Sequence, residues 1–466
     1  MMGELPAPQS ELFYEFCLEK HIPSGHLLRT IDQFLDFTAV RQHLRPFYSA
    51  AGRPSIDPEL MIRMLLLGYC YGIRSERRLC EEVHFNLAYR WFCRLGLEGE
   101  VPDHSTFSKN RHGRFRDSQL FRFVFESVVE QCMNQGLVGG EGFAVDASLI
   151  KADAHRARGF PGEQGIQWNR PERHSRAVRE YLDALDNDPQ TIRAHEATRK
   201  AVSLTDPAAQ WTCAVGGPAY YAYSTNYLID IDAAIILDVQ ASPAKLTDET
   251  EAARTLIEHT EARFGLKPER LIGDTAYGNA QMLGWLVEDK QITPHIPVLD
   301  KSDGKAGQFG RSEFFWESDA DRYVCPAGHP LQRNLRSFAE KRSGITKENT
   351  VIYRARQMHC QPCSLKAQCC PKEPARKIHR SLHENARNVA RSLATTEAYA
   401  QSRRDRKKVE MLFAHLKRIL KLDRLRLRGL SGAQDEFLLA ATAQNLRKLA
   451  KLASWPPPRC VVQVPA

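Results

Sequence analysis

The chain has 466 residues, of which 42% are hydrophobic, so it is long enough to bury a large core and to form about two to four domains. No segment approaches the roughly 18 consecutive apolar residues of a membrane span, because Arg63 interrupts the most apolar stretch. The first ten residues also lack the basic flank and apolar centre of an export signal. These features argue against an integral membrane protein and predict a cytoplasmic location, where the 12 cysteines are expected to stay reduced.

The formal net charge of +9 is concentrated near the C-terminus. Residues 376–451 contain 19 Lys and Arg against 7 Asp and Glu, a net charge of +12, whereas the rest of the chain has a net charge of −3. A basic region of this kind indicates a polyanionic partner, and nucleic acid is the one expected. A solvated basic surface is the alternative, but the amphipathic periodicity of this region favours a folded element.

Between residues 58 and 125 the pattern predicts short helices joined by tight turns. Asp57 is placed to cap the first helix, Ser75 precedes the second, and two more are expected at residues 87–95 and 106–116. Basic side chains lie along these helices: Arg74, Arg77, Arg78, Lys109, Arg111 and Arg114. The arrangement fits a helix-turn-helix domain that reads DNA, and a scaffold for a following catalytic domain explains it equally well.

From residue 142 the apolar period changes to the one typical of strands. The expected elements are a strand at 142–150, a hairpin of 225–229 and 234–239 turning at 230–232, a helix at 246–264 ended by Gly265, a strand at 270–274, a helix at 280–289 and a strand at 293–298. A polar segment, residues 151–218, interrupts this order. It is expected to be a partly helical excursion that either touches DNA or is a mobile insertion.

A second interruption contains five of the 12 cysteines within 46 residues, including a C-x2-C pair. In a reducing compartment this spacing indicates a structural zinc site in which thiolates hold the metal tetrahedrally. The favoured ligands are Cys325, Cys360, Cys363 and Cys369, with His329, His359 and Cys370 as substitutes. A reduced, metal-free cluster is the alternative, because only one short-spaced pair is present.

Three acidic residues stand out by their local pattern. Asp146 and Asp274 each follow an apolar run, and Glu410 lies in a predicted helix on one stripe with Arg406 and Lys417. The apolar face of that helix consists of Val409, Leu412, Phe413, Leu416 and Leu420. Turn or cap residues, and a solvated ion pair, are the ordinary explanations. Three carboxylates that converge on one point repel each other and are tolerated mainly where divalent cations neutralise them.

The order of Asp146, Asp274 in GDTAYG, and Glu410 inside R-x3-E-x6-K resembles the catalytic triad of bacterial insertion-sequence transposases of the DDE class. The resemblance covers most of the chain. It also includes DPELMIRMLLLGYCYGIRSERRLCEEVHFNLAYRWFC, PDHSTFSKNRHGRF, YSTNYLIDIDAAIILDVQASPA, RFGLKPERLIGDTAYG and PHIPVLDKSDG. Related transposases often have Tyr three residues before the motif Arg, whereas this chain has Arg403, so a stacking or hydroxyl role is not carried over to that position.

The resemblance implies an α+β or α/β fold: a ribonuclease H-like mixed sheet with flanking helices, after an all-helical helix-turn-helix-like domain and with a small zinc-ribbon-like Cys-rich insertion. The domains expected are 1–138 (helical, DNA-binding), 139–300 (first part of the catalytic core, with the insertion 151–218), 301–375 (Cys-rich), 376–453 (C-terminal helices of the core) and 454–466 (tail).

The function implied is cleavage at the terminal inverted repeats of a mobile element and joining of its 3′ hydroxyls to target DNA. Asp146, Asp274 and Glu410 would hold two Mg²⁺ or Mn²⁺ ions. Double-stranded DNA would contact Arg406, Lys417, Arg426 and Arg428 near the catalytic residues and Arg77, Arg78, Lys109 and Arg111 in the N-terminal domain. A homodimer is expected on DNA, in the bacterial cytoplasm. The alternatives are a non-catalytic DNA-binding regulator derived from a transposase and a metal-dependent nuclease of the same fold.

Overall fold

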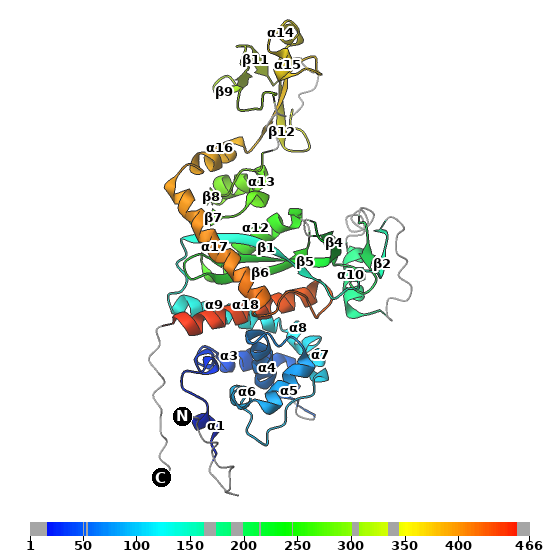
Figure 1. Ribbon diagram of the computed structural model, residues 1–466, viewed down its shortest axis with the longest axis vertical. Coiled ribbons are helices and arrows are strands. Elements are labelled where there is room, and N and C mark those ends of the chain that lie inside the picture. Colours follow the sequence, from blue (N-terminus) through cyan, green and yellow to red (C-terminus); the bar gives the residue numbers. More distant parts are fainter. Residues whose placement is uncertain are drawn as a thin grey trace, which may run out of the picture. The chain divides into compact units, whose positions relative to one another are not determined.

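The computed structural model describes residues 16–49, 51–52, 55–162, 174–187, 199–213, 216–244, 246–300, 307–333 and 344–453. The chain divides into two compact units, whose elements Figure 1 labels. Unit 1 consists of Met1–Gly140, Asp146–Lys267 and Lys408–Ala466, and unit 2 of Glu141–Val145 and Pro268–Lys407.

Unit 1 begins with a series of helices. They are α1 (Leu18–His21), α2 (Leu27–Asp32), α3 (Phe37–Leu44), η1 (Arg45–Phe47), α4 (Pro58–Cys70), α5 (Glu76–Phe85), α6 (Leu87–Phe92), α7 (Ser105–Arg111), α8 (Arg114–Asp117) and α9 (Leu120–Asn134). The predicted caps are confirmed: Asp57 accepts the N–H of Glu59 at 2.8 Å, and Ser75 accepts that of Arg78 at 3.4 Å. Every residue of α4 from position 61 onward is buried, so this helix forms the centre of the helical part.

Two helix boundaries differ from the prediction. The helix expected at 87–95 ends at Phe92, and the chain turns through Arg94, whose φ of 58° is left-handed. The helix expected at 106–116 is two helices, because Gly113 between them has φ −117° and ψ −116°, outside the helical region. The apolar periodicity therefore predicted correctly that both segments are helical, but it did not predict the lengths of the helices.

An antiparallel arrangement of strands follows in unit 1. β5 (Ala219–Asp230) pairs through its first residues with β4 (Gln210–Cys213) and through the rest with β6 (Ile235–Pro243). β1 (Gly142–Lys151) is also a neighbour of β5. The expected hairpin is confirmed, and its turn includes Ala234 in the left-handed region at φ 55°.

Two long helices complete the packing of these strands. α12 (Leu246–Phe264) has the predicted bounds, and Gly265 ends it with a φ of 67°. α18 (Leu430–Leu452) contacts β6, α9 and α4 (Figure 1). Its Asn445 side chain accepts the N–H of Ile236 at 3.0 Å and donates to the same residue's carbonyl at 2.8 Å. A side chain of α18 thus hydrogen-bonds the backbone of β6 directly.

The polar segment 151–218 is described only in part. It contains β2 (Gly159–Phe160), β3 (Val202–Ser203), the helix α10 (Arg176–Asn187) and the sheet strand β4. Its described residues are therefore partly helical, as predicted, and they also supply strands. The remaining residues of this segment lie outside the described ranges.

Unit 2 contains parallel strands. The first residues of β1 pair with β7 (Arg270–Ile272), and β7 pairs with β8 (Thr293–His295), both in parallel. The helical elements of this unit are η4 (Thr275–Tyr277), α13 (Ala280–Gly284) with its π-helical continuation η5 (Trp285–Asp289), α14 (Gln357–Cys360), α15 (Lys366–Cys369), α16 (Glu384–Leu393) and the first part of α17 (Glu397–Arg418). α17 continues into unit 1.

A separate antiparallel sheet occupies the region of the cysteines. Its strands, in spatial order, are β13 (Lys377–Ser381), β12 (Thr350–Arg354), β11 (Pro330–Gln332), β10 (Arg322–Val324) and β9 (Phe315–Glu317). It has its own apolar cluster, formed by Phe314, Tyr323, Leu331, Val351, Tyr353, Ala355 and Ile378. Cys325, Cys360 and Cys369 pack against this cluster, so the cysteines belong to a small folded element.

The fold is thus of mixed α/β content, with a helical N-terminal part and both parallel and antiparallel strand pairs. The domain limits expected from the sequence stay a prediction, and the tail 454–466 lies outside the described residues. Within the described ranges, the helices are all too short or too polar to cross a membrane.

Candidate active site

The strands that precede Asp146 and Asp274 are parallel neighbours. Within unit 2 the register pairs Ala144 of β1 with Ile272 of β7. Asp146 comes two residues after Ala144 within β1, and Asp274 comes two residues after Ile272, just beyond the end of β7. The strand expected at 142–150 is confirmed as β1, so Asp146 lies within it. Asp146 is partly buried, and its Oδ1 accepts the N–H of Ala147 at 2.8 Å.

Asp274 caps the short helix η4 and still exposes its carboxylate. Its Oδ1 accepts the N–H of Ala276 at 2.8 Å, which fixes the side chain where β7 ends. Its Oδ2 lies 3.7 Å from Nη2 of Arg406, and the two side chains are 38% and 31% exposed. A pair this open stabilises the fold little, and it shows that Arg406 of α17 lies near the Asp274 carboxylate.

Glu410 lies on α17 one helical turn after Arg406. The apolar face predicted for this helix is confirmed, since Val409, Leu412 and Leu416 are almost completely buried while Glu410 is exposed. Lys417 is half-buried, and burial lowers its pKa, an effect that the nearby Asp423 carboxylate partly opposes. The helix therefore presents one acidic and two basic side chains beside its buried face.

The residues that follow α17 hold the next two predicted contacts. Arg426 is exposed, and its backbone N–H donates to Glu436, a carboxylate that is 1% exposed, at 2.6 Å. Arg428 is 43% exposed and pairs with Asp153 at 3.0 Å. Sequence reasoning missed Asp153, because a lone Asp in a polar segment carries no local signal of a distant arginine.

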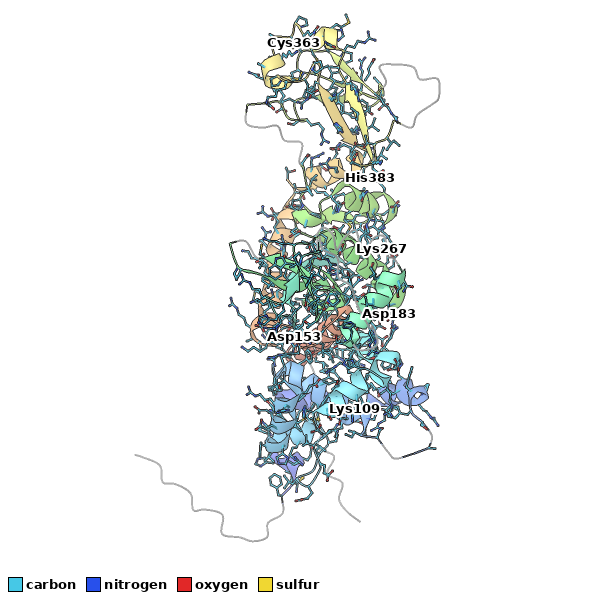
Figure 2. The ribbon with its side chains drawn as sticks, turned by 90° about the vertical axis from the view of Figure 1, so that its right-hand side faces the viewer. Lys109, Asp153, Asp183, Lys267, Cys363 and His383 are labelled. Atoms are coloured by element: carbon cyan, nitrogen blue, oxygen red, sulfur yellow. The ribbon has the colours of Figure 1, made fainter. Side chains whose placement is uncertain are left out.

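The four basic residues predicted in the N-terminal helices differ in how their charges are compensated. Arg77 and Lys109 are exposed, and Figure 2 labels Lys109. Arg78 is exposed and pairs with Glu82 on its own helix at 3.1 Å. Arg111 is 5% exposed in its side chain and pairs with Glu76 at 2.5 Å, so its charge is largely compensated within the protein.

The predicted zinc ligands are brought together. Cys325, Cys360, Cys363 and Cys369 line one cavity, together with the substitutes His329, His359 and Cys370. Figure 2 labels Cys363 in this region. The Sγ of Cys325 accepts the N–H of His329 at 3.3 Å, and burial raises the pKa of Cys369 to about 12. Within the described ranges, however, no group of three or more His, Cys, Asp or Glu side chains is arranged to hold a metal ion.

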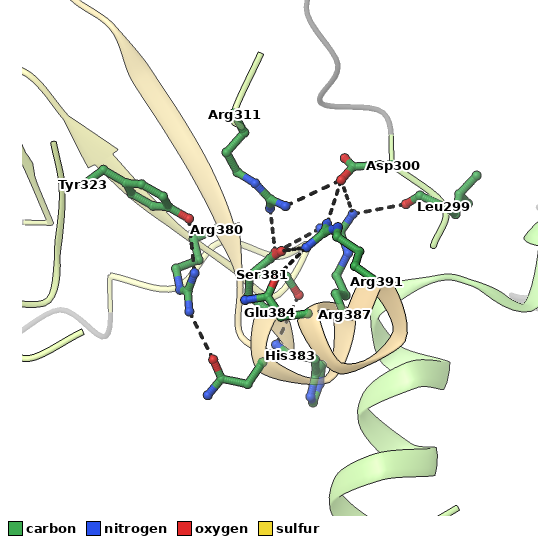
Figure 3. Close-up of polar contacts among 12 residues, drawn as sticks. Leu299, Asp300, Arg311, Tyr323, Arg380, Ser381, His383, Glu384, Arg387 and Arg391 are labelled. Atoms are coloured by element: carbon green, nitrogen blue, oxygen red, sulfur yellow. Dashed lines mark hydrogen bonds and ion pairs between the residues drawn. The ribbon is translucent and has the colours of Figure 1, made fainter. Parts of the chain in front are cut away.

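A buried ion cluster in unit 2 was not predicted. Figure 3 shows Arg311, Arg387 and Arg391 directed toward Glu384 and Asp300. Glu384 is 2% exposed and lies 2.6 to 3.0 Å from the three guanidinium groups. Burial raises the pKa of Glu384, but these arginines outweigh it, so the pKa is lowered overall. The sequence signal for this cluster was that Arg387 and Arg391 follow Glu384 by three and seven residues, a spacing that places them on one side of α16.

Two family models match the chain. A transposase domain (DUF772) matches residues 16–113, and a transposase DDE domain matches residues 324–450. The second match contains Glu410, Arg406 and the cysteines, while Asp146 and Asp274 precede it. No solved structure matches the chain. Both matched models are of transposase domains, and they support an insertion-sequence transposase of the DDE class.

Proposed function

We propose that the protein is a DNA transposase that cleaves at the terminal inverted repeats of an insertion sequence and joins the freed 3′ hydroxyls to target DNA. The contact between Asp274 and Arg406 carries this proposal. It links the acidic residue after β7 with the basic residue one turn before Glu410, so two separate parts of the motif meet in one unit.

We further propose a ribonuclease H-like arrangement for the catalytic core. Its support is that β1 and β7 are parallel neighbours, whereas β5 and β6 form an antiparallel hairpin beside β1. In a fold of this kind Asp146 and Asp274 would come from neighbouring strands, and a helix such as α17 would add Glu410.

Asp146, Asp274 and Glu410 are the side chains that would hold two Mg²⁺ or Mn²⁺ ions. Carboxylate oxygens are the donors these ions prefer, and the exposure of Asp274 and Glu410 leaves them accessible. Such a metal pair, when bound, activates the attacking oxygen and stabilises the leaving one. The protein's own part would be to supply one carboxylate from β1, one from the residue position after β7 and one from α17.

The basic side chains would hold the DNA. Arg406 and Lys417 flank Glu410 on α17 and would neutralise phosphates near the scissile bond, and Arg426 and Arg428 would contact the backbone further along. Among the N-terminal contacts, the exposed Lys109 and Arg77 are best placed to face DNA, Arg78 must share its charge with Glu82, and Arg111 would act through helix packing.

The cysteine cavity is proposed to bind one structural Zn²⁺. The residue types are those of a zinc site, because four thiols line one cavity and Cys325 accepts a backbone N–H, but the described side chains would have to draw closer together to hold the ion. We also propose a cytoplasmic homodimer on DNA, since two element ends must be processed together.

The experiment is an assay of the purified protein on duplex DNA that carries the inverted repeats flanking its gene, with a plasmid as target. We expect cleavage at the repeat ends and joined products in Mg²⁺ or Mn²⁺, and neither in EDTA. Cleavage without joining would instead indicate a nuclease of the same fold. Binding without cleavage in any divalent metal would indicate a DNA-binding regulator.

A further inference from the structure

The segment that follows α17, residues 421–429, is a loop held from several sides within unit 1. Its backbone N–H groups donate to the carbonyl of Lys151 at 2.8 Å, to Glu436 twice at 2.6 Å, and to Asp206 at 3.2 Å. The two carboxylates are buried, at 1% and 0% exposure. Buried acceptors of this kind fix the backbone of the loop, so each of its side chains is attached at a fixed Cα position.

Apolar and basic side chains alternate along this loop. Leu422 and Leu425 are completely buried, whereas the side chains of Arg424 and Arg428 are 52% and 43% exposed. The fixed backbone therefore presents the guanidinium groups of Arg424, Arg426 and Arg428 to solvent from the segment that links α17 to α18, and the first and last of them share a partner.

The guanidinium groups of Arg424 and Arg428 converge on one carboxylate. Asp153 Oδ2 lies 3.0 Å from Nη2 and 3.1 Å from Nε of Arg428, whose Nε also donates to the Asp153 carbonyl at 2.9 Å. Asp153 Oδ1 lies 3.4 Å from Nη2 of Arg424. Two arginines around one anion leave an excess of one positive charge, and Lys151 on the adjoining strand end is exposed as well.

We propose that Arg424 and Arg428 form a binding site for one backbone phosphate of DNA, and that the Asp153 carboxylate occupies this site in the DNA-free protein. Two guanidinium forks suit a phosphate better than a carboxylate, because a phosphodiester offers oxygens to both. This inference rests on the proposed function. It adds Arg424 to the DNA-binding residues and gives Asp153 the role of a competing anion.

The exposure of these groups makes the exchange feasible. Asp153 is 34% exposed, and ion pairs between open side chains are weak, so a phosphate at the high local charge density of a duplex can displace it. The location also suits the reaction, since Asp153 follows directly on β1, the strand that carries Asp146. The nearby Asp423 carboxylate interacts with Lys417 instead.

The test compares D153N with D183N, a matched change at an exposed aspartate on α10 (Figure 2 labels both). The probe is a fluorescent duplex of random sequence, titrated with the full-length protein in metal-free buffer at several salt concentrations. We expect D153N to bind about twofold to fivefold tighter at low salt, the range that a weak surface ion pair allows. Its salt dependence should steepen by about one phosphate contact, and D183N should match the parent.

A second background separates competition from simple repulsion. In an R424A/R428A protein the D153N change should give no gain, because the site that it frees no longer exists. If D153N still tightens binding there, or if it behaves like D183N in the parent, the proposal is wrong. Thermal melting of each variant verifies folding. A parental protein that binds no DNA at low salt would instead overturn the proposed function itself.

Discussion

Asp206 is a buried carboxyl group whose protonation should set part of the pH dependence of stability. Its Oδ1 accepts the hydroxyl of Tyr223 at 2.5 Å and the N–H of Gly429 at 3.2 Å, and the residue is 0% exposed. Burial raises its pKa from 3.8 to about 6, although these hydrogen bonds oppose the shift. The same cause raises the pKa of Asp435 to about 6.

The direction in which stability changes with pH follows from how many protons the folded and the unfolded states bind. Between about pH 4 and 6 the folded protein keeps a proton on Asp206 that the unfolded chain has lost, so its contribution to stability falls as the pH rises. Above pH 6 the full cost of the buried charge is present, on the order of 3 kcal/mol. We expect Asp206→Asn, which keeps the acceptor oxygen, to reduce the loss of thermal stability between pH 5 and pH 7.5.

Melting temperatures at the two pH values measure this prediction. Asp183→Asn, at an exposed position, is the control and should melt with the parental pH dependence. An Asp206→Asn protein with the parental difference between pH 5 and 7.5 would mean that Asp206 is ionised at no unusual cost in the folded state.

At the scale of elements, local sequence signals predicted the helix bounds that depend only on nearby residues. α4 and α12 begin or end where a cap residue or a left-handed glycine requires it, and these bounds are confirmed. The break at Gly113 was missed because the apolar period continues across it. Pairing over long separations, such as Arg428 with Asp153 or Arg74 with Glu436, leaves no periodic trace and required the folded chain.

The same distinction between local signals and long-range pairing applies to the candidate site. The buried face of α17 and the exposure of Glu410 follow from helical spacing alone. That Asp274 meets Arg406, and that β1 and β7 are parallel neighbours, depends on chain topology, which the sequence suggested only through its resemblance to a family.

The sheet that carries the cysteines should depend on metal for part of its stability. The cavity lined by Cys325, Cys360, Cys363 and Cys369 adjoins a small apolar cluster, and a domain of this size gains much of its stability from a metal. We expect about one zinc per chain by elemental analysis. Cys360→Ser with Cys363→Ser should remove the zinc and lower thermal stability.

Cys213 provides the control, because it is exposed and lies outside the cavity. Its replacement by Ser should leave zinc content and melting unchanged. Parental protein without stoichiometric zinc, or a double variant that melts like the parent, would favour the reduced, metal-free cluster.

At the scale of the whole molecule, sequence recognition and general DNA affinity should depend on different regions. Base contacts specify, whereas phosphate contacts only position. We expect Arg77→Ala with Lys109→Ala to reduce the ratio of affinities for repeat and scrambled DNA. Lys417→Ala should weaken binding to both equally and reduce the salt dependence by about one phosphate contact.

These variants are best made in the full chain, because α18 packs against α4 and an N-terminal fragment would lose that support. Competition titrations with repeat and scrambled duplexes give both quantities. An unchanged affinity ratio in the Arg77 and Lys109 double variant would assign recognition elsewhere and leave the N-terminal helices as a scaffold.

The central claim is that Asp146, Asp274 and Glu410 together support metal-dependent cleavage of DNA. Its most direct test is the rate of cleavage of repeat-end DNA in Mg²⁺ by Asp146→Asn, Asp274→Asn and Glu410→Gln, with Asp183→Asn as the control. We expect each of the three to lose cleavage by orders of magnitude, because each removes a ligand from chemistry that depends on both ions. DNA binding in metal-free buffer should persist or tighten, and the control should cleave normally. A Glu410→Gln enzyme that cuts repeat-end DNA at the parental rate would contradict the account and leave Glu410 an ordinary surface residue of α17.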